Sequence, residues 1–166
     1  MSADGHQLQP GEIGELWIRS ASVIRGYWNN PKATAESFTA GFWHSGDLGS
    51  VDAQNFVRVF DRQKDMINRG GLKIYSAEVE SVLSGHPAVV ESAIIAKPCP
   101  VLGERVHAVV VTRNPVGVEV LRAWCAERLS DYKVPETIDL TSDPLPRNAN
   151  GKVMKRQLRE AWAARA

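Results

Sequence analysis

Two charged residues lie directly after glycines, where the small backbone leaves room for a ligand. Asp47 follows Ser45-Gly46. Its carboxylate accepts hydrogen bonds and can be bidentate, so it could hold both hydroxyls of a ribose, or it could bond its own turn backbone. Lys152 follows Gly151, and a lysine in such a loop is either a mobile point charge directed at a phosphate or a solvated surface group. Neither residue decides between its alternatives by itself.

Other arrangements of reactive side chains are incomplete. The four histidines have no His or Cys neighbour at ligand spacing, so we expect no metal site. Gly151-Lys152 is not a Walker loop, because Pro146 stands where the first glycine is needed and no Ser or Thr follows the lysine. Neither Ser45 nor Ser76 lies in the Gly-x-Ser-x-Gly elbow of serine hydrolases. The pair Gly70-Gly71 either admits a ligand close to the backbone or forms a tight turn.

The elements that must position these residues fall into two stretches of different character. Over the first 60 residues the pattern predicts a short helix at 32–38 and strands at 15–19, 41–47 and 56–60. Beyond residue 65 it predicts strands at 89–96 and 106–112, and helices beginning at Ser76, at Val118 and at about Val153. We expect Ser76 to cap the first of these helices. Its buried face would comprise Val79, Val82 and Leu83.

The alternation of strands and helices over residues 66–166 predicts a compact α+β domain. The first 60 residues offer only a few short strands, which form a poor core for independent stability. We therefore expect them to be the tail of a larger domain. The five charged or polar residues at 61–65 interrupt the apolar pattern and predict a linker.

Charge and composition exclude several classes of protein. With 20 basic and 19 acidic residues the net charge is +1, so there is no electrostatic case for nucleic acid as the main partner. No apolar run approaches the roughly 18 residues of a membrane span, and the first residues lack the features of a signal peptide. Cys99 and Cys125 form no CxxC pair, so we expect reduced thiols in a cytoplasmic protein.

The C-terminal segment is basic, which predicts a solvated helix face rather than a binding patch. Its basic residues are Lys152, Lys155, Arg156, Arg159 and Arg165. Acidic residues elsewhere in the second half of the chain dilute this charge.

Several short motifs occur in a fixed order along the chain. They are Gly14-Glu15-Leu16, Gly26-Tyr27-Trp28, Trp43-His44-Ser45-Gly46-Asp47-Leu48-Gly49, Arg62-Gln63-Lys64-Asp65-Met66-Ile67, Gly70-Gly71, Glu78-Val79-Glu80, and Pro146-Arg147 with Gly151-Lys152. This succession resembles the C-terminal third of the adenylate-forming (AMP-binding) superfamily, which includes acyl- and aryl-CoA synthetases, adenylation domains of peptide synthetases and luciferases. The resemblance covers nearly the whole chain from Gly11 onwards.

The resemblance implies a fold and a division of the chain. Residues 1–61 would be the β-rich tail of the large N-terminal AMP-binding domain, the end of a distorted β-barrel subdomain. Residues 62–166 would be the mobile α+β C-terminal domain, a short sheet flanked by helices. The hinge between the two would lie around 61–65.

The resemblance also assigns roles to single residues. Asp47 is similar to the aspartate that grips the AMP ribose, and Arg62 to the arginine that reaches the same ribose. Lys64 stands at the hinge position, and Lys152 at the position of the adenylation lysine. Ser45 replaces the usual threonine but keeps the hydroxyl.

The thioester-forming conformation of the family contributes a further segment. The loop that lines its pantetheine tunnel is similar to the stretch from Gly70 and Gly71 through Lys73 to Glu80. We therefore expect Gly70, Gly71 and Lys73 to contact CoA.

By resemblance, the function is that of an ATP-dependent acid–thiol ligase. A carboxylate attacks the α-phosphate of Mg-ATP, and CoA then displaces AMP from the acyl-AMP. The phosphate loop, the acyl pocket and most of the Mg²⁺ site of the family lie upstream of the motifs present here. We therefore expect a fragment that is inactive alone and whose partners are the missing N-terminal domain, a carboxylic acid and CoA. Two alternatives remain open, an adenylation domain that loads a carrier protein and a non-catalytic nucleotide-binding remnant.

Overall fold

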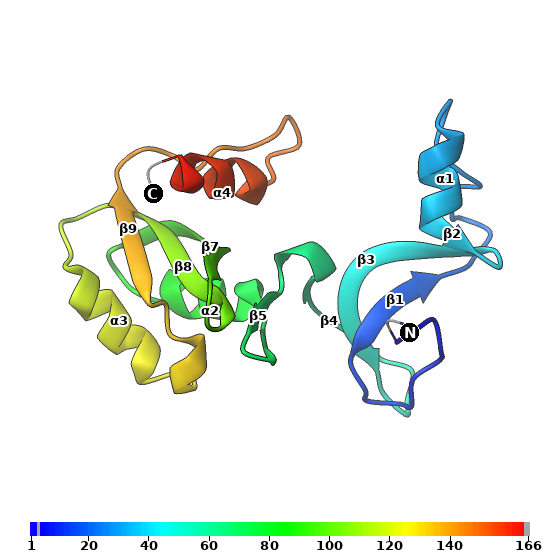
Figure 1. The fold of residues 1–166 in the computed structure, drawn as a ribbon, viewed down its shortest axis with the longest axis horizontal. Coiled ribbons are helices and arrows are strands. Elements are labelled where there is room, and N and C mark those ends of the chain that lie inside the picture. Colours follow the sequence, from blue (N-terminus) through cyan, green and yellow to red (C-terminus); the bar gives the residue numbers. More distant parts are fainter. Residues whose placement is uncertain (3, 165–166) are drawn as a thin grey trace. The chain divides into compact units, whose positions relative to one another are not determined.

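The computed structural model describes residues 1–2 and 4–164, so Arg165 of the basic segment lies outside the described residues. The chain divides into two compact units, one formed by Met1–Lys64 and one that begins at Asp65 (Figure 1). Each unit has its own sheet, and the helices of the described residues are distributed between them.

The first unit is a four-stranded antiparallel sheet with one short helix. Its elements are β1 (Gly14–Ile18), α1 (Pro31–Ser37), β2 (Phe38–Thr39), β3 (Phe42–Val51) and β4 (Val57–Arg62). The long strand β3 pairs with the other three strands, and the described residues of this unit form an open sheet rather than a closed barrel. The side chain of Asn30 accepts the N–H of Ala33, and Pro31 begins α1, which is why the helix begins there.

The second unit is a mixed sheet covered by helices. Its elements are β5 (Ile67–Arg69), β6 (Leu72–Ile74), α2 (Ser76–Ser84), β7 (Val89–Cys99), β8 (Gly103–Thr112), α3 (Val118–Ala126), β9 (Thr137–Thr141) and α4 (Lys155–Ala163). The strand order is β6-β5-β8-β7, and β9 pairs with β8 in parallel. A 3₁₀ turn, Gln63–Asp65, precedes β5, and a second one, Asp131–Lys133, precedes β9.

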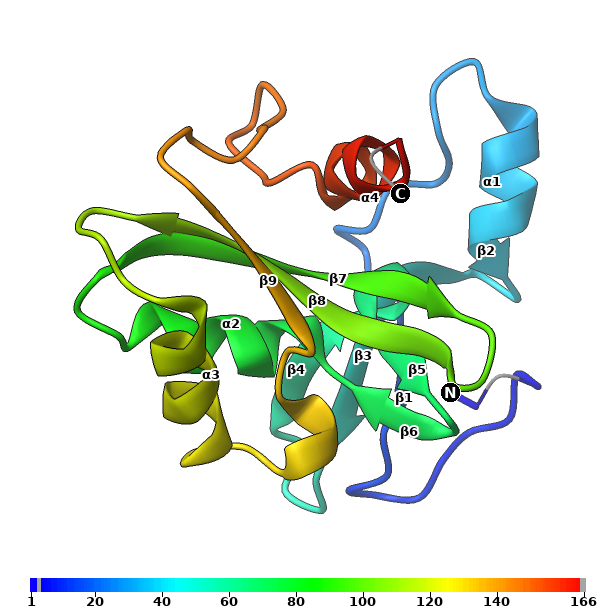
Figure 2. The same ribbon diagram turned by 60° about the vertical axis from the view of Figure 1, so that its left-hand side comes forward.

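The sheet of the second unit lies between α4 on one face and α2 with α3 on the other (Figure 2). Neighbouring strand residues point to opposite faces. Ile94 belongs to the larger core with Leu83 of α2 and Leu121 of α3. Ala93 belongs to the smaller core, against which Leu158 of α4 packs. Each fully buried aliphatic side chain of this kind contributes about 1.5–3 kcal/mol, so the second unit has a substantial core of its own.

The α+β class is confirmed, as are the helices near 32–38, 76–84 and 118–126, but the periodicity missed several strands. The hairpin β5–β6 has three residues in each strand, and β9 has five, too few to show a convincing alternation.

Two expectations about local structure were wrong. Ser76 does not cap α2, because the residue at that position is Tyr75 and no side chain caps the helix. Ser76 is fully buried instead and accepts a hydrogen bond from Lys155. The basic face of α4 is not simply solvated, because Lys155 pairs with Glu80 and Arg159 pairs with Asp65.

None of the helices in the described residues combines the length and the apolar character that crossing a bilayer needs.

Candidate functional site

Asp47 and Arg62 lie opposite each other on neighbouring strands of the first unit. They are register partners in the antiparallel pairing of β3 with β4. The guanidinium Nε of Arg62 lies 3.1 Å from the Asp47 carboxylate. The side chain of Arg62 is 48% exposed and that of Asp47 is 30% exposed, so both remain accessible to a ligand. The fold thus places two residues 15 positions apart in the sequence at one point of the sheet surface.

The backbone before Asp47 is part of β3, at an irregular point of its pairing with β1, and does not form a separate tight turn. Gly46 has φ +70°, a left-handed conformation that favours glycine, and its N–H donates to the carboxylate of Glu15 at 3.0 Å. The buried Ser45 hydroxyl accepts the N–H of Asp47 at 3.0 Å. Serine at position 45, where threonine is usual, therefore still supplies a hydroxyl that accepts the N–H of Asp47.

Arg62 is supported by the residue before it. Its N–H donates to the carboxylate of Asp61 at 2.8 Å, and Asp61 is 9% exposed. Lys64 follows in the 3₁₀ turn and is exposed. It is the last residue of the first compact unit.

Gly70 and Gly71 form the two-residue turn of the β5–β6 hairpin, with φ +58° and +89°. Positive φ at both central positions is the geometry of a type I′ turn, which explains two successive glycines. The N–H of Gly71 donates to the side chain of Asn68 at 3.0 Å, and that of Gly70 to the carbonyl of Leu102 at 2.8 Å. Lys73 lies exposed on β6, opposite Asn68.

Lys152 lies exposed in a loop that its own backbone organises. The side chain of Asn148 accepts the N–H of Lys152 at 2.9 Å, and the carbonyl of Lys152 accepts the N–H of Asn148 at 3.0 Å. Arg147 donates to the carbonyl of Gly151 and pairs with Glu91 of β7. A flexible cationic side chain thus projects from a backbone that is tied to the sheet.

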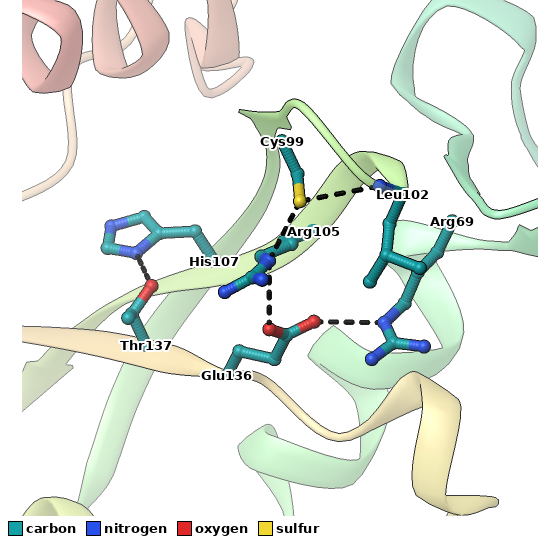
Figure 3. A network of polar contacts seen from close by, with 7 residues as sticks. All are labelled: Arg69, Cys99, Leu102, Arg105, His107, Glu136 and Thr137. Carbon is teal, nitrogen blue, oxygen red and sulfur yellow. Dashed lines mark hydrogen bonds and ion pairs between the residues drawn. The ribbon is translucent and has the colours of Figure 1, made fainter.

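A network of polar contacts that the sequence did not reveal lies beside the glycine turn (Figure 3). The Glu136 carboxylate accepts the Nε–H of Arg69 at 2.9 Å, and its second oxygen lies 3.3 Å from Nε of Arg105. Arg105 also donates to the sulfur of Cys99 at 3.1 Å. No short motif signals this network, because its members come from four separate segments.

The sulfur of Cys99 lies in an electropositive setting. The N–H of Leu102 donates to it at 3.4 Å, and this bond is the main reason why the pKa of the thiol lies below its ordinary value. The Arg105 guanidinium lowers this pKa further. Cys125 differs, because burial raises the pKa of its thiol to about 11. Both cysteines are free, and only Cys99 has a polarised sulfur.

The described residues bring some of the expected site residues together and leave others apart. Asp47 and Arg62 are in contact in the first unit. In the second unit, Gly70, Gly71 and Lys73 share one hairpin, while Lys152 lies on a separate loop. Nowhere in residues 1–2 and 4–164 do three His, Cys, Asp or Glu side chains gather as metal ligands would.

Comparison with known proteins places these features in a family. Residues 78–152 match the family model described as the AMP-binding enzyme C-terminal domain. The chain is 43% identical over 160 residues to a feruloyl-CoA synthase from an Amycolatopsis species, a match that covers 95% of this chain and 32% of that protein. The chain therefore spans about a third of the length of this relative.

Solved structures of related enzymes have the same fold. The o-succinylbenzoate CoA synthetase from Bacillus subtilis, solved with the acyl-adenylate intermediate OSB-AMP, matches with a TM-score of 0.89 and 39% identity, over 95% of this chain and 32% of that one. The amide bond synthetase McbA from Marinactinospora thermotolerans matches with a TM-score of 0.85 and 33% identity, over 97% and 33%. The chain belongs to the adenylate-forming (AMP-binding) superfamily and corresponds to the C-terminal portion of its enzymes.

Proposed function

We propose that this chain is the C-terminal portion of an ATP-dependent acyl-CoA synthetase, which adenylates a carboxylic acid and then transfers the acyl group to CoA. The observation that carries the proposal is the pairing of Asp47 with Arg62. Both side chains are partly exposed, and one carboxylate oxygen of Asp47 contacts Arg62. The second oxygen and the remaining guanidinium donors suit the hydroxyls of the AMP ribose.

In the first half-reaction, Lys152 is the residue that offsets charge. Negative charge builds up around the α-phosphate of ATP as the carboxylate attacks and pyrophosphate leaves. The exposed ammonium of Lys152 stands on an ordered loop and can be directed at this phosphate. Stabilisation of this kind is worth about 3 kcal/mol where water is excluded.

In the second half-reaction, the glycine turn of Gly70 and Gly71 faces the active site in place of the Lys152 loop. The thiol of CoA attacks the acyl carbonyl and AMP leaves. Gly70 and Gly71 carry no side chains, so a pantetheine arm can pass close to their backbone, with Lys73 on the same hairpin. We propose that the second unit, which begins at Asp65, rotates about a hinge at 61–65 with Lys64 as its pivot, to exchange these two surfaces, while Arg62 stays paired with Asp47 in the first unit.

The remaining parts of the active site would come from a large N-terminal domain. Residues 1–61 would be the tail of that domain, and the open sheet of the first unit supports this. The first unit exposes large apolar side chains, with Trp28 98%, Phe56 73% and Val57 60% exposed, which a further domain would cover. The phosphate loop, the acyl pocket and most Mg²⁺ ligands would lie there, so we expect this chain alone to be inactive.

CoA is the acceptor that the comparisons favour. Identity to the feruloyl-CoA synthase is 43%, against 33% for the amide bond synthetase. A carrier-protein thiol and an amine are therefore the lesser alternatives, and a non-catalytic nucleotide-binding remnant is a third.

The two free, buried cysteines are consistent with a reducing compartment, and we propose the cytoplasm.

The test is pyrophosphate release by the longer protein that carries this chain, with Mg-ATP and a panel of aliphatic and aryl carboxylates. We expect release that depends on the carboxylate, and thioester formation on addition of CoA. Adenylation with no CoA thioester, but with transfer to a carrier protein or an amine, would replace the CoA assignment. Absence of adenylation, together with AMP binding to the 166-residue chain in calorimetry, would instead support the remnant.

A further inference from the structure

The glycine turn depends on neighbours outside its own hairpin. Its flanking strands have three residues each, and a hairpin of this size is marginal by itself. Outside the hairpin, Gly70 donates to the carbonyl of Leu102, and Asn68 donates to the carboxylate of Glu104 at 2.7 Å. The hairpin is therefore held by the turn between β7 and β8 and by the first residues of β8.

Glu136 connects this segment to the turn from the other side. It uses one carboxylate oxygen for Arg69, the residue immediately before Gly70, and the other for Arg105 of β8. Its own N–H donates to the carbonyl of Val106 at 3.0 Å, which fixes its backbone to the same strand. The side chains of Glu136 and Arg69 are each 26% exposed, so solvent screens this contact only in part.

The contacts close into a ring that includes Gly70, and Figure 3 shows its part from Arg69 through Glu136, Arg105 and Cys99 to the N–H of Leu102. From Glu136 the ring runs through Arg105 to the sulfur of Cys99, and from that sulfur to the N–H of Leu102. The carbonyl of Leu102 accepts the N–H of Gly70, and Arg69 returns to Glu136. Glu136 is the one acidic member of this ring, so its charge holds both arginines.

We propose that Glu136 is a positioning residue for the CoA step, because its contacts with Arg69 and Arg105 hold the glycine turn in the shape that admits the pantetheine arm. This inference rests on the proposed function, in which Gly70 and Gly71 meet CoA. Asp47, Arg62 and Lys152 are not members of the ring, so Glu136 has no direct part in adenylation.

The first experiment compares the two half-reactions in the longer enzyme. In Glu136→Gln the side chain keeps its size but loses the charge, and both arginines lose their anionic partner. We expect the KM for CoA to rise roughly tenfold with little change in kcat, while carboxylate-dependent exchange of pyrophosphate into ATP stays within about twofold of the wild type. The matched control is Glu119→Gln, an 82% exposed glutamate that pairs with Arg122 on α3, and it should change neither half-reaction.

The second experiment does not require activity. In the 166-residue chain, amide hydrogen exchange of Gly70, Gly71 and Leu102 is followed by NMR in the wild type and in Glu136→Gln. We expect exchange at these amides to accelerate about tenfold in the variant, while the core amides of Ile94 and Ala108 keep their rates.

The outcomes separate this inference from the proposed function. Unchanged exchange at Gly70 and Gly71 overturns the positioning role, and so does an equal loss in both half-reactions, which would indicate a merely structural effect. A wild-type enzyme that does not adenylate any carboxylate contradicts the proposed function, while the exchange rates at the turn still decide whether Glu136 holds it.

Discussion

Arg159 of α4 donates to the carboxylate of Asp65 at 2.6 Å and so ties the terminal helix to the first residue of the second unit. Lys155, one turn earlier on the same helix face, contacts Glu80 and Ser76 of α2, each at 2.6 Å. The helix that follows Lys152 is therefore anchored at two points. In the proposed mechanism, the loop of Lys152 moves together with the segment that follows the hinge.

We predict that Asp65→Asn destabilises the second unit. The Asp65 side chain is 12% exposed, and removing its charge breaks the ion pair with Arg159. The free energy of unfolding should fall by about 2 kcal/mol, measured by urea denaturation. Glu160→Gln is the control, because the pair of Glu160 with Arg156 is 64% and 78% exposed and should contribute less than about 0.5 kcal/mol. Equal effects of the two variants would contradict the anchoring role.

Lys152→Ala should separate the half-reactions of the longer enzyme. Loss of the ammonium removes the charge that offsets the α-phosphate, so acyl-AMP formation should fall by about 100-fold or more. Thioester formation from supplied acyl-AMP and CoA should remain within about threefold. Lys32→Ala removes a lysine that is 87% exposed and should leave both rates unchanged. If both half-reactions are lost in Lys152→Ala, the assignment of Lys152 to adenylation is wrong.

Lys64→Pro tests the hinge. Proline fixes φ and removes an N–H in the 3₁₀ turn, so the segment loses the freedom that a rotation needs. We expect the CoA-dependent step to fall at least about tenfold and adenylation to fall less. Rapid-quench measurements give the rates of adenylation and of the CoA-dependent step separately, and Lys64→Ala is the control for loss of the side chain. Equal losses in both steps would argue against a hinge at this position.

Stability of the second unit should decrease at acidic pH because of His107. This histidine is 1% exposed, and burial lowers its pKa below 6.5, although Asp139 opposes the shift and Lys97 adds to it. Because the folded pKa lies below the unfolded one, the neutral ring favours the folded state. This contribution is complete above about pH 6.5 and is lost as the pH falls toward the folded pKa.

The measurement is the free energy of unfolding of the chain between pH 8 and pH 5, for the wild type and for His107→Gln. The variant should lose part of the acid sensitivity, whereas His6→Gln, which changes an exposed histidine, should retain it. An unchanged pH dependence in His107→Gln would mean that other groups cause the acid sensitivity.

Local features of the chain could be recognised from the sequence. The glycines at 70, 71 and 151 adopt the positive φ that their positions in turns require, and Gly46 adopts it at an irregular point of β3. The helix at 118–126 follows from apolar spacing, and the order of motifs identified the superfamily. The turns and the helix depend on residues close together in the chain, so local sequence and periodicity are sufficient to predict them, whereas the superfamily was recognised by the resemblance of the motifs in their order.

The contacts between distant segments were decided by the tertiary structure. Arg69 and Glu136 are 67 positions apart, Ser76 and Lys155 are 79 apart, and Asp65 and Arg159 are 94 apart. No local pattern specifies such pairs, because the order of strands and the packing of α4 on the sheet determine which charges meet. The roles proposed for Asp47 and Lys152 were thus suggested by the sequence through its resemblance to the superfamily, whereas the pairing of Asp47 with Arg62 and the contacts of Glu136 beside the glycine turn required the fold.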